Sequence, residues 1–198
     1  DITDFPLEYR ECINLDFQSN KEFIVIDLNS DLERYRGLDK FIRVIPQEFS
    51  EEKRKKLMKL CEICPNLQVG SRLGNDNMYG AVLNSSGQEY KNAEEWISYV
   101  LGKLKPEYTT AQKIAVIDNE IGKKISYSAD FGTKNFDEDK ARCLWKIISS
   151  GYGVCNGIAN VEQYIYNRIG VESEFINSGN HAFLKVKNVD ILLSNGQL

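Results

Sequence analysis

The sequence has 198 residues, 42% of them hydrophobic and 27% charged, which is the balance of an ordinary globular protein that buries its own core. Its formal net charge of −4 offers no basic surface for phosphates, so we expect no nucleic-acid partner. No apolar run approaches the roughly 20 residues of a membrane span, and we expect none. The first residues show no basic-then-apolar leader pattern, and a cytoplasmic and a secreted location both stay open.

Residues 21–83 predict a small α/β unit. Short runs of β-branched and apolar residues predict strands at 22–28, 40–45, 67–69 and 79–83. Ser50 predicts a helix start, because its side chain can cap the first turn and the two glutamates that follow complement the helix dipole. Pro65 ends this helix.

No reactive side chains gather in this unit, so its role is left unknown. The turn-forming stretch Asn84-Ser85-Ser86-Gly87 indicates a linker. We therefore divide the chain into an N-terminal α/β region of unknown role, 1–88, and a core domain, 89–198. The sequence holds no internal repeat.

The sequence has five cysteines, an odd number in a chain long enough not to need disulfides, and we expect mostly reduced thiols. Cys61 and Cys64 form a Cys-x-x-Cys pair, but a zinc site needs a second ligand pair at suitable spacing, and none follows. The pair instead continues the helical spacing of Leu57 and Leu60, which predicts a buried helix face. We expect no metal and no cofactor.

Three helices are expected between the linker and residue 151. Capping boxes predict the starts of the first two, in the pairs Asn92–Glu95 and Thr109–Gln112. The second ends near Gly122, and an extended segment follows at 125–127. Asp137 predicts the start of the third helix and Gly151 its end, because glycine adopts the left-handed conformation common after a helix.

The C-terminal part predicts one more helix and three strands. Apolar residues recur at helical spacing from Val154 to Ile169, and Gly170 ends that helix. Alternation of apolar and polar residues predicts strands at 171–176 and 181–187. A further strand at 189–193 can pair back on the strand that precedes it.

Cys155 follows a glycine-flanked turn and stands on the first turn of this last helix. The thiolate is the reactive form of cysteine, and the unpaired N–H groups and positive dipole end of a helix start stabilise it. The same N–H groups can receive the negative oxygen of a tetrahedral intermediate, with the Cys155 N–H as a natural donor. Small residues at Gly157 and Ala159 let other elements approach the helix start. The position predicts a thiol nucleophile.

His181 is the single histidine of the chain, and it opens a predicted strand, which makes it the candidate base for Cys155. Its ring needs an orienting acceptor. A hairpin over residues 181–195 brings Ser194 and Asn195 near His181, one or two places off register, whereas Asp190 lies at the turn, several residues of about 3.3 Å away. We therefore expect a Cys155–His181–Asn195 site.

Several short patterns along residues 89–198 resemble the transglutaminase-like superfamily. They are Gly153-Val154-Cys155-x-Gly157-x-Ala159, Gly170-Val171 (the family's Gly-Ile) and His181-Ala182-Phe183 (more often His-Ala-Trp). The helix and extended segment from Thr109 to Tyr127, and the helix that leads into the Gly-Val-Cys turn, resemble the family as well. Residues 1–88 have no counterpart in this resemblance.

The resemblance implies a papain-like α+β fold, in which a central helix bearing Cys155 packs on an antiparallel sheet bearing His181. The small α/β unit would precede this core. The family usually places an aspartate on the strand after the histidine, but this chain has Asn195-Gly196 there. Either Asn195 takes that role or the orienting residue is missing.

The residues and the resemblance together imply thiol-dependent acyl transfer or hydrolysis on an amide of a protein or peptide substrate. Water as acceptor makes a cysteine peptidase or amidase, and an amine makes a transglutaminase-like acyltransferase. The sequence leaves this choice open, and we favour hydrolysis because no calcium-site pattern is present. A non-catalytic transglutaminase-like binding or scaffold module is the alternative; an acetyltransferase is a weaker one, since no acyl-CoA recognition feature is visible.

Overall fold

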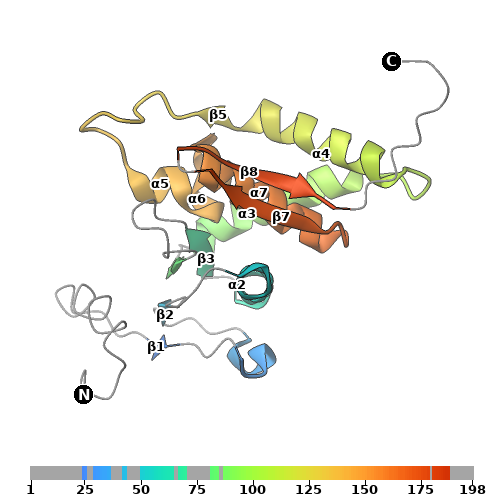
Figure 1. The fold of residues 1–198 in the computed structure, drawn as a ribbon, viewed down its shortest axis with the longest axis horizontal. Helices are drawn as coiled ribbons and strands as arrows, with labels where there is room; N and C mark the ends of the chain where they lie inside the picture. The colour runs from blue at the N-terminus through green and yellow to red at the C-terminus, as the bar shows by residue number, and fades with distance from the viewer. Residues whose placement is uncertain are drawn as a thin grey trace.

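The computed structural model describes residues 24–25, 29–36, 42–43, 50–64, 67–70, 81–84, 87–178 and 180–187. Within these ranges the chain is an α+β protein in which helices combine with four two-stranded sheets (Figure 1). None of the helices in these ranges has both the length and the apolar character that a membrane crossing needs. The predicted strand 189–193 and the predicted site residue Asn195 lie outside the described residues.

The N-terminal region holds its strands and its main helix where the sequence predicts them. The strands β1 (Ile24–Val25) and β2 (Ile42–Arg43) pair in parallel, and β3 (Leu67–Gly70) pairs antiparallel with β4 (Ala81–Asn84). A short 3-10 turn, η2 (Leu32–Tyr35), lies between β1 and β2, and α2 (Glu51–Ile63) lies between the two sheets in the chain. The helix begins directly after Ser50 and ends before Pro65, as expected.

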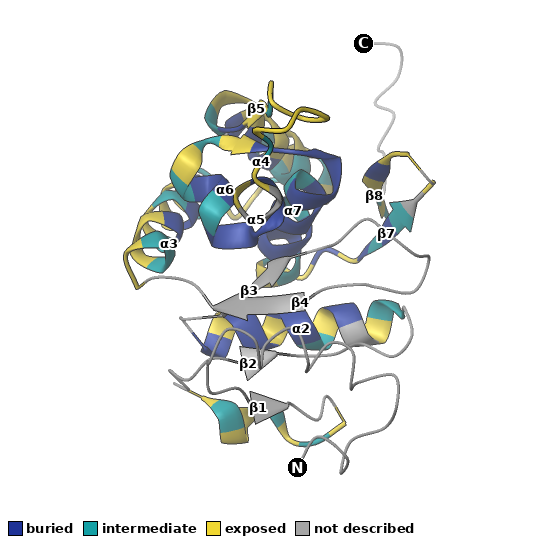
Figure 2. Cartoon of the chain, turned by 90° about the vertical axis from the view of Figure 1, so that its left-hand side faces the viewer, coloured by how far each residue is buried: buried dark blue, intermediate teal, exposed yellow. Residues whose placement is uncertain are grey.

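One face of α2 enters the main hydrophobic core. Leu57, Leu60, Cys61 and Cys64 are each 1% exposed or less, which confirms the predicted buried stripe. They share one cluster of buried residues with side chains from the helices beyond residue 87, such as Ile97, Ile117 and Trp145. Figure 2 shows this buried face of α2 in dark blue. The division at residue 88 stays a prediction, and the core itself runs across it.

The first two helices after the linker differ in how well the sequence located them. The helix α3 (Gly87–Gly102) begins before Asn92, so the predicted cap there is wrong; the Asn92 amide oxygen instead accepts a hydrogen bond from Gln88, one turn earlier in the same helix, at 2.8 Å. The helix α4 (Thr110–Lys124) has the predicted capping box. The Gln112 N–H donates to the Thr109 hydroxyl at 3.2 Å, and the Thr109 N–H donates to the Gln112 side chain at 2.9 Å.

The predicted third helix is two helices. The Asp137 carboxylate accepts a hydrogen bond at 3.1 Å from the backbone N–H three residues on, and α5 (Glu138–Arg142) follows it. Cys143 then adopts an extended conformation, with φ −93° and ψ 129°, before α6 (Leu144–Ser150) begins. Gly151 ends α6 in the left-handed conformation, with φ 77°, which confirms its predicted role.

The helix α7 (Cys155–Arg168) is central to the fold. It contacts α2, α4, α5 and α6 and the strands β7 and β8. Because other elements surround it, polar as well as apolar side chains are buried: Asn156, Asn160 and Gln163 are each 1% exposed or less. Gly170, with φ 75°, lies just past its end, as predicted. The dark blue surface of α7 in Figure 2 shows this burial.

The strands β7 (Ser173–Asn177) and β8 (Ala182–Val186) form an antiparallel hairpin that lies along α7 (Figure 1), as the alternating pattern predicts. The register places Phe175 opposite Leu184 and Asn177 opposite Ala182. Phe175 and Ala182 are each 3% exposed, because they face α7. We call this element the β7–β8 hairpin.

Candidate functional site

Cys155 is the first residue of α7, as the sequence predicts. The residue before it, Val154, is extended, with φ −116° and ψ 170°, and makes no side-chain cap. The backbone N–H groups of a first helical turn have no partner within the helix, so the thiol stands at the positive end of the helix dipole. Cys155 is 8% exposed and shares a small apolar cluster with Ala159, Phe175 and Ala182.

The start of α7 fits closely against the junction of α5 and α6. The Val154 N–H donates a hydrogen bond to the Ala141 carbonyl at 3.0 Å. One turn later Gly157 packs so tightly that a Cβ atom there would lie 2.4 Å from the Ala141 oxygen and 2.4 Å from a methyl group of Ile147. The prediction that a small residue at 157 permits close approach is therefore confirmed.

A tyrosine that the sequence analysis did not select lies beside this helix start. The strand β5 (Ser126–Tyr127) pairs in parallel with β6 (Tyr152–Gly153), and Tyr127 lies opposite Gly153, two residues before the cysteine. The backbone N–H of Ser128 donates to the Gly153 carbonyl at 2.8 Å. The sequence signals for this residue were its place at the end of an extended segment and the resemblance of the stretch from Thr109 to Tyr127, and neither indicated a role in the site.

The electrostatics of Tyr127 depend on Cys155. Burial raises the pKa of the Tyr127 hydroxyl above its ordinary value, and the charge and side chain of Cys155 raise it further. The Cys155 backbone and the charge of Arg142 act in the opposite direction. Tyr127 is therefore a neutral hydroxyl throughout the range in which thiols ionise.

His181 stands immediately before β8 with an exposed side chain. Its ring stacks on that of Phe183, with 5.8 Å between centroids and 26° between planes. The next residue, Ala182, faces inward and joins Cys155 in the apolar cluster. Among the described side chains, no hydrogen bond joins the His181 ring to the Cys155 thiol. The fold thus brings the start of β8 to Cys155 while the imidazole rests against Phe183.

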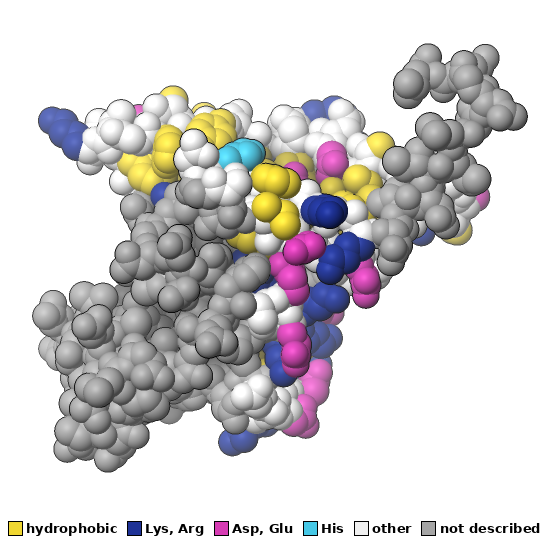
Figure 3. Space-filling view, viewed as in Figure 1, with side chains coloured by type: hydrophobic (Ala, Val, Ile, Leu, Met, Phe, Trp, Pro, Cys, Tyr) yellow, Lys and Arg dark blue, Asp and Glu magenta, His cyan; other side chains and the backbone are white. Residues whose placement is uncertain are grey.

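The backbone at His181 is held in place although its ring is exposed. The N–H and the hydroxyl of Ser178 both donate to the His181 carbonyl, at 2.9 and 3.1 Å. In Figure 3 the histidine, coloured cyan, lies at the surface with hydrophobic side chains beside it. Asn195 and Asp190, the two residues weighed as its orienting partner, lie outside the described residues.

Comparisons with known proteins find a likeness among the solved structures. No family model matches the chain, and no curated protein matches it. A crystal structure of a TGase matches with a TM-score of 0.37 and 13% sequence identity. The match covers 74% of this chain and 48% of that one, so the chain spans about half the length of the TGase.

Three further cysteines of the described residues lie in the interior. Cys61, Cys64 and Cys143 are buried, and the first two follow the core spacing that the sequence predicts. The Cys64 thiol donates to the Tyr35 carbonyl at 2.9 Å. Within the described ranges, no three His, Cys, Asp or Glu side chains are placed to hold a metal ion.

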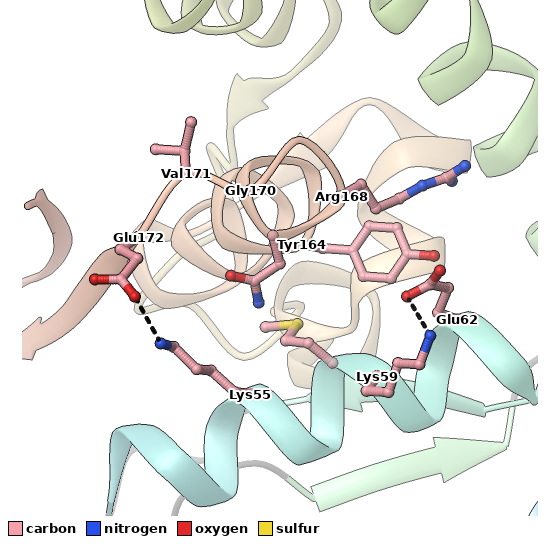
Figure 4. A pocket seen from close by; sticks show the side chains of 10 residues that line it. Lys55, Lys59, Glu62, Tyr164, Arg168, Gly170, Val171 and Glu172 are labelled. Atoms are coloured by element: carbon pink, nitrogen blue, oxygen red, sulfur yellow. Dashed lines mark hydrogen bonds and ion pairs between the residues drawn. The ribbon is translucent and has the colours of Figure 1, made fainter. Parts of the chain in front are cut away.

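A separate hollow of about 510 Å³ lies between α2 and the C-terminal end of α7 (Figure 4). Charged side chains of both signs line it, and two ion pairs stand at its edges: Lys55 with Glu172 at 3.8 Å and Lys59 with Glu62 at 3.4 Å. Tyr164 forms part of its wall. Cys155 and His181 are not among its lining residues, so this hollow is distinct from the candidate site.

Proposed function

We propose that the protein carries out thiol-dependent acyl transfer or hydrolysis at an amide of a protein or peptide, with Cys155 as nucleophile and His181 as base. The observation that carries the proposal is the position of Cys155 at the first residue of α7, in one apolar cluster with Ala182, the neighbour of His181. A thiol at a helix start is activated by the dipole, and the start of β8 is where a base is needed.

The reaction divides into two balanced steps. The Cys155 sulfur attacks the carbonyl carbon while His181 accepts the thiol proton; the C–N bond then breaks, and the proton passes to the leaving amine. The resulting thioester is attacked by water in a peptidase or amidase, or by an amine in a transglutaminase-like enzyme. This second attack breaks the C–S bond and returns the proton to the thiol. We favour water as the acceptor.

Two further groups at the helix start take part in the proposed reaction. The Cys155 N–H and the Tyr127 hydroxyl are the donors proposed for the oxygen that becomes negative in the tetrahedral intermediate. For His181, the proposal requires a turn of the side chain away from Phe183 toward the thiol. The Ser178 hydrogen bonds hold the His181 backbone in place while its side chain turns.

The primary test compares Cys155→Ala with Cys143→Ala. We expect Cys155→Ala to abolish rapid alkylation by iodoacetamide at about pH 6, where an ordinary thiol is largely protonated, and to abolish turnover. Turnover is measured as new amino groups released from a protein substrate and as incorporation of a fluorescent primary amine. Cys143→Ala should keep both. Labelling or turnover that persists in Cys155→Ala would sink the assignment.

Asn195 is proposed as the residue that orients the His181 ring. Asn195→Ala should lower turnover by roughly 10²-fold, and Asn195→Asp should retain most of it, because a carboxylate accepts the same ring N–H. Asp190→Asn serves as the control and should leave turnover unchanged. The reverse pattern, with Asp190 essential and Asn195 dispensable, would transfer the role to Asp190.

The second candidate function is a non-catalytic binding or scaffold module. The observation that favours it is the resting place of the His181 ring on Phe183, with a thiol that is only 8% exposed. The two candidates differ in the pH dependence of Cys155 alkylation. An activated thiolate reacts well below the ordinary thiol pKa of about 8.5, whereas an inert cysteine follows that value.

A further inference from the structure

A buried arginine in the N-terminal region contacts the central helix. Arg54 on α2 is 1% exposed, and its guanidinium donates to Gln163 Oε1 at 3.0 Å and to Asn160 Oδ1 at 2.6 Å, both on α7. The guanidinium carbon lies 3.9 Å from the centre of the Phe175 ring on β7. Burying a charge is costly unless it is closely partnered, so this arrangement marks Arg54 as a residue with a specific task.

A glutamate one turn earlier on α2 holds the same strand by its backbone. One Glu51 oxygen accepts a hydrogen bond from the Phe175 N–H at 2.8 Å, and the other accepts from the Gln163 side chain at 3.3 Å. Glu51 therefore holds Phe175 by its main chain, and Arg54 holds it by its ring. Gln163 is shared between them, so the carboxylate and the guanidinium belong to one network.

Phe175 connects these contacts of Glu51 and Arg54 to the candidate site. Its side chain belongs to the small cluster that contains Cys155, Ala159 and Ala182. Its strand is paired with β8 residue by residue, and Asn177 of β7 lies opposite Ala182, the residue after His181. A shift of β7 would therefore move the start of β8 relative to the start of α7.

We propose that Arg54 and Glu51 are positioning residues that hold the β7–β8 hairpin against α7 and so set the separation between Cys155 and His181. The inference rests on the proposed function for its catalytic meaning. It gives the N-terminal region a role that the sequence left unknown: its helix α2 supports the site from behind. Neither residue touches the reacting atoms, and both act through Phe175.

The test measures Cys155 alkylation at about pH 6 and about pH 9 in Arg54→Met, Arg54→Lys and Glu51→Gln. A displaced base should lower the rate at pH 6 by roughly 10- to 100-fold and leave the rate at pH 9 unchanged, since an ordinary thiol is largely ionised at about pH 9. Lysine should not rescue, because it lacks the planar fork that stacks on a ring and donates to two amides. Lys55→Met removes an exposed charge one position along α2 and should change neither rate.

Two results would overturn the inference. If the variants react faster at both pH values, Arg54 and Glu51 only keep the fold closed over a buried thiol. If they react like the wild type at both pH values, the contacts of Arg54 and Glu51 with Phe175 have no bearing on the site. Where Arg54→Met fails to fold, Glu51→Gln decides the question alone, because it keeps the side-chain shape while it removes the charge and one of the two accepting oxygens.

A separate readout distinguishes this inference from the proposed function. Hydrogen exchange of the backbone amides in the β7–β8 hairpin should quicken in Arg54→Met, while that of α4 stays as in the wild type. If wild-type Cys155 shows no excess reactivity at pH 6, the proposed function is wrong, and the exchange data alone then decide whether α2 positions the hairpin. Unchanged exchange in the hairpin would contradict the positioning role.

Discussion

The hydroxyl group of Tyr127 lies against Cys155, close enough that both the side chain and the backbone of the cysteine act on its pKa. Because that pKa is raised, first by burial and then by the Cys155 charge, the hydroxyl keeps its proton and can donate to a thiolate or to a carbonyl oxygen. Tyr127 is thus a residue outside α7 and the β7–β8 hairpin whose protonation depends on the cysteine.

We expect Tyr127→Phe to lower the rate of Cys155 alkylation at about pH 6 by about 10- to 150-fold, because a hydrogen bond to a charged group is worth roughly 1.5–3 kcal/mol. The ring and its edge contact with Phe131, at 6.0 Å, would remain. The measurement is the rate as a function of pH. Tyr152→Phe, on the neighbouring strand, is the control, and equal rates in all three proteins would exclude a role for the hydroxyl.

Gly157→Ala should be among the most destabilising single substitutions in α7. The added methyl group would lie 2.4 Å from a backbone oxygen of Ala141, which cannot turn aside as a side chain can. We expect a loss of about 3 kcal/mol or more in the free energy of unfolding, measured by urea denaturation. Gly122→Ala on α4 is the matched control: a Cβ there meets nothing within 4 Å, and the change should stabilise by about 0.5–1 kcal/mol.

Glu162 on α7 should make stability depend on pH. Burial, and then the charge of Asp118, raise the pKa of Glu162 from 4.5 to about 7. The folded state therefore binds more protons than the unfolded state between these values, so stability falls as pH rises from about 4.5 to about 7 and stays lower above it. We expect Glu162→Gln to be more stable than the wild type by about 1–3 kcal/mol at pH 8 and nearly equal to it at pH 4.

Thermal unfolding at the two pH values measures this difference. Glu95→Gln, at an exposed position on α3, is the control and should give the same small change at both. Burial also raises the pKa of the neighbouring Asp118 carboxyl, and the hydrogen bond donated by the Tyr166 hydroxyl offsets only part of that rise. The difference between Glu162→Gln and the wild type therefore isolates the contribution of Glu162. A difference between Glu162→Gln and the wild type that does not vary with pH would contradict the prediction.

The capping box of α4 gives a local prediction. Thr109→Ala removes the hydroxyl that accepts from the Gln112 N–H and should cost about 1 kcal/mol in the free energy of unfolding. Thr110→Ala, one residue on and exposed, should change it by less than about 0.5 kcal/mol. The denaturant midpoints of the two variants decide whether the cap stabilises the protein; coinciding midpoints would show that it does not.

Features that act between near neighbours in the chain could be predicted from the sequence. The Thr109 cap and the glycine end of α6 at Gly151 each depend on a few consecutive residues, so a short pattern is sufficient. The break between α5 and α6 at Cys143 was missed because it depends on contact with another segment. The carbonyl of Ala141, two residues before Cys143, accepts a hydrogen bond from the N–H of Val154. Periodicity alone continues smoothly through that point.

In the candidate site too, some features could be predicted from the sequence and others could not. A cysteine at a helix start can be recognised from the glycines and small residues around it, and the structure places Cys155 there. The direction of the Tyr127 side chain depends on the pairing of β5 with β6, which no local pattern specifies. Arg54 could not be found at all, because arginine is usually exposed and its partners, Asn160 and Gln163, lie 106 and 109 residues further along the chain.

The contact of α2 with α7 also determines whether the chain can be divided at residue 88 into two stable pieces. A fragment that starts at residue 89 keeps Asn160 and Gln163 but loses the guanidinium between them, together with the apolar stripe of α2. Such a fragment would expose the apolar surface that α2 covers in the whole protein, and it should therefore self-associate. The two pieces would behave as halves of a split protein, so that adding residues 1–88 back as a separate chain should restore both solubility and the reactivity of Cys155.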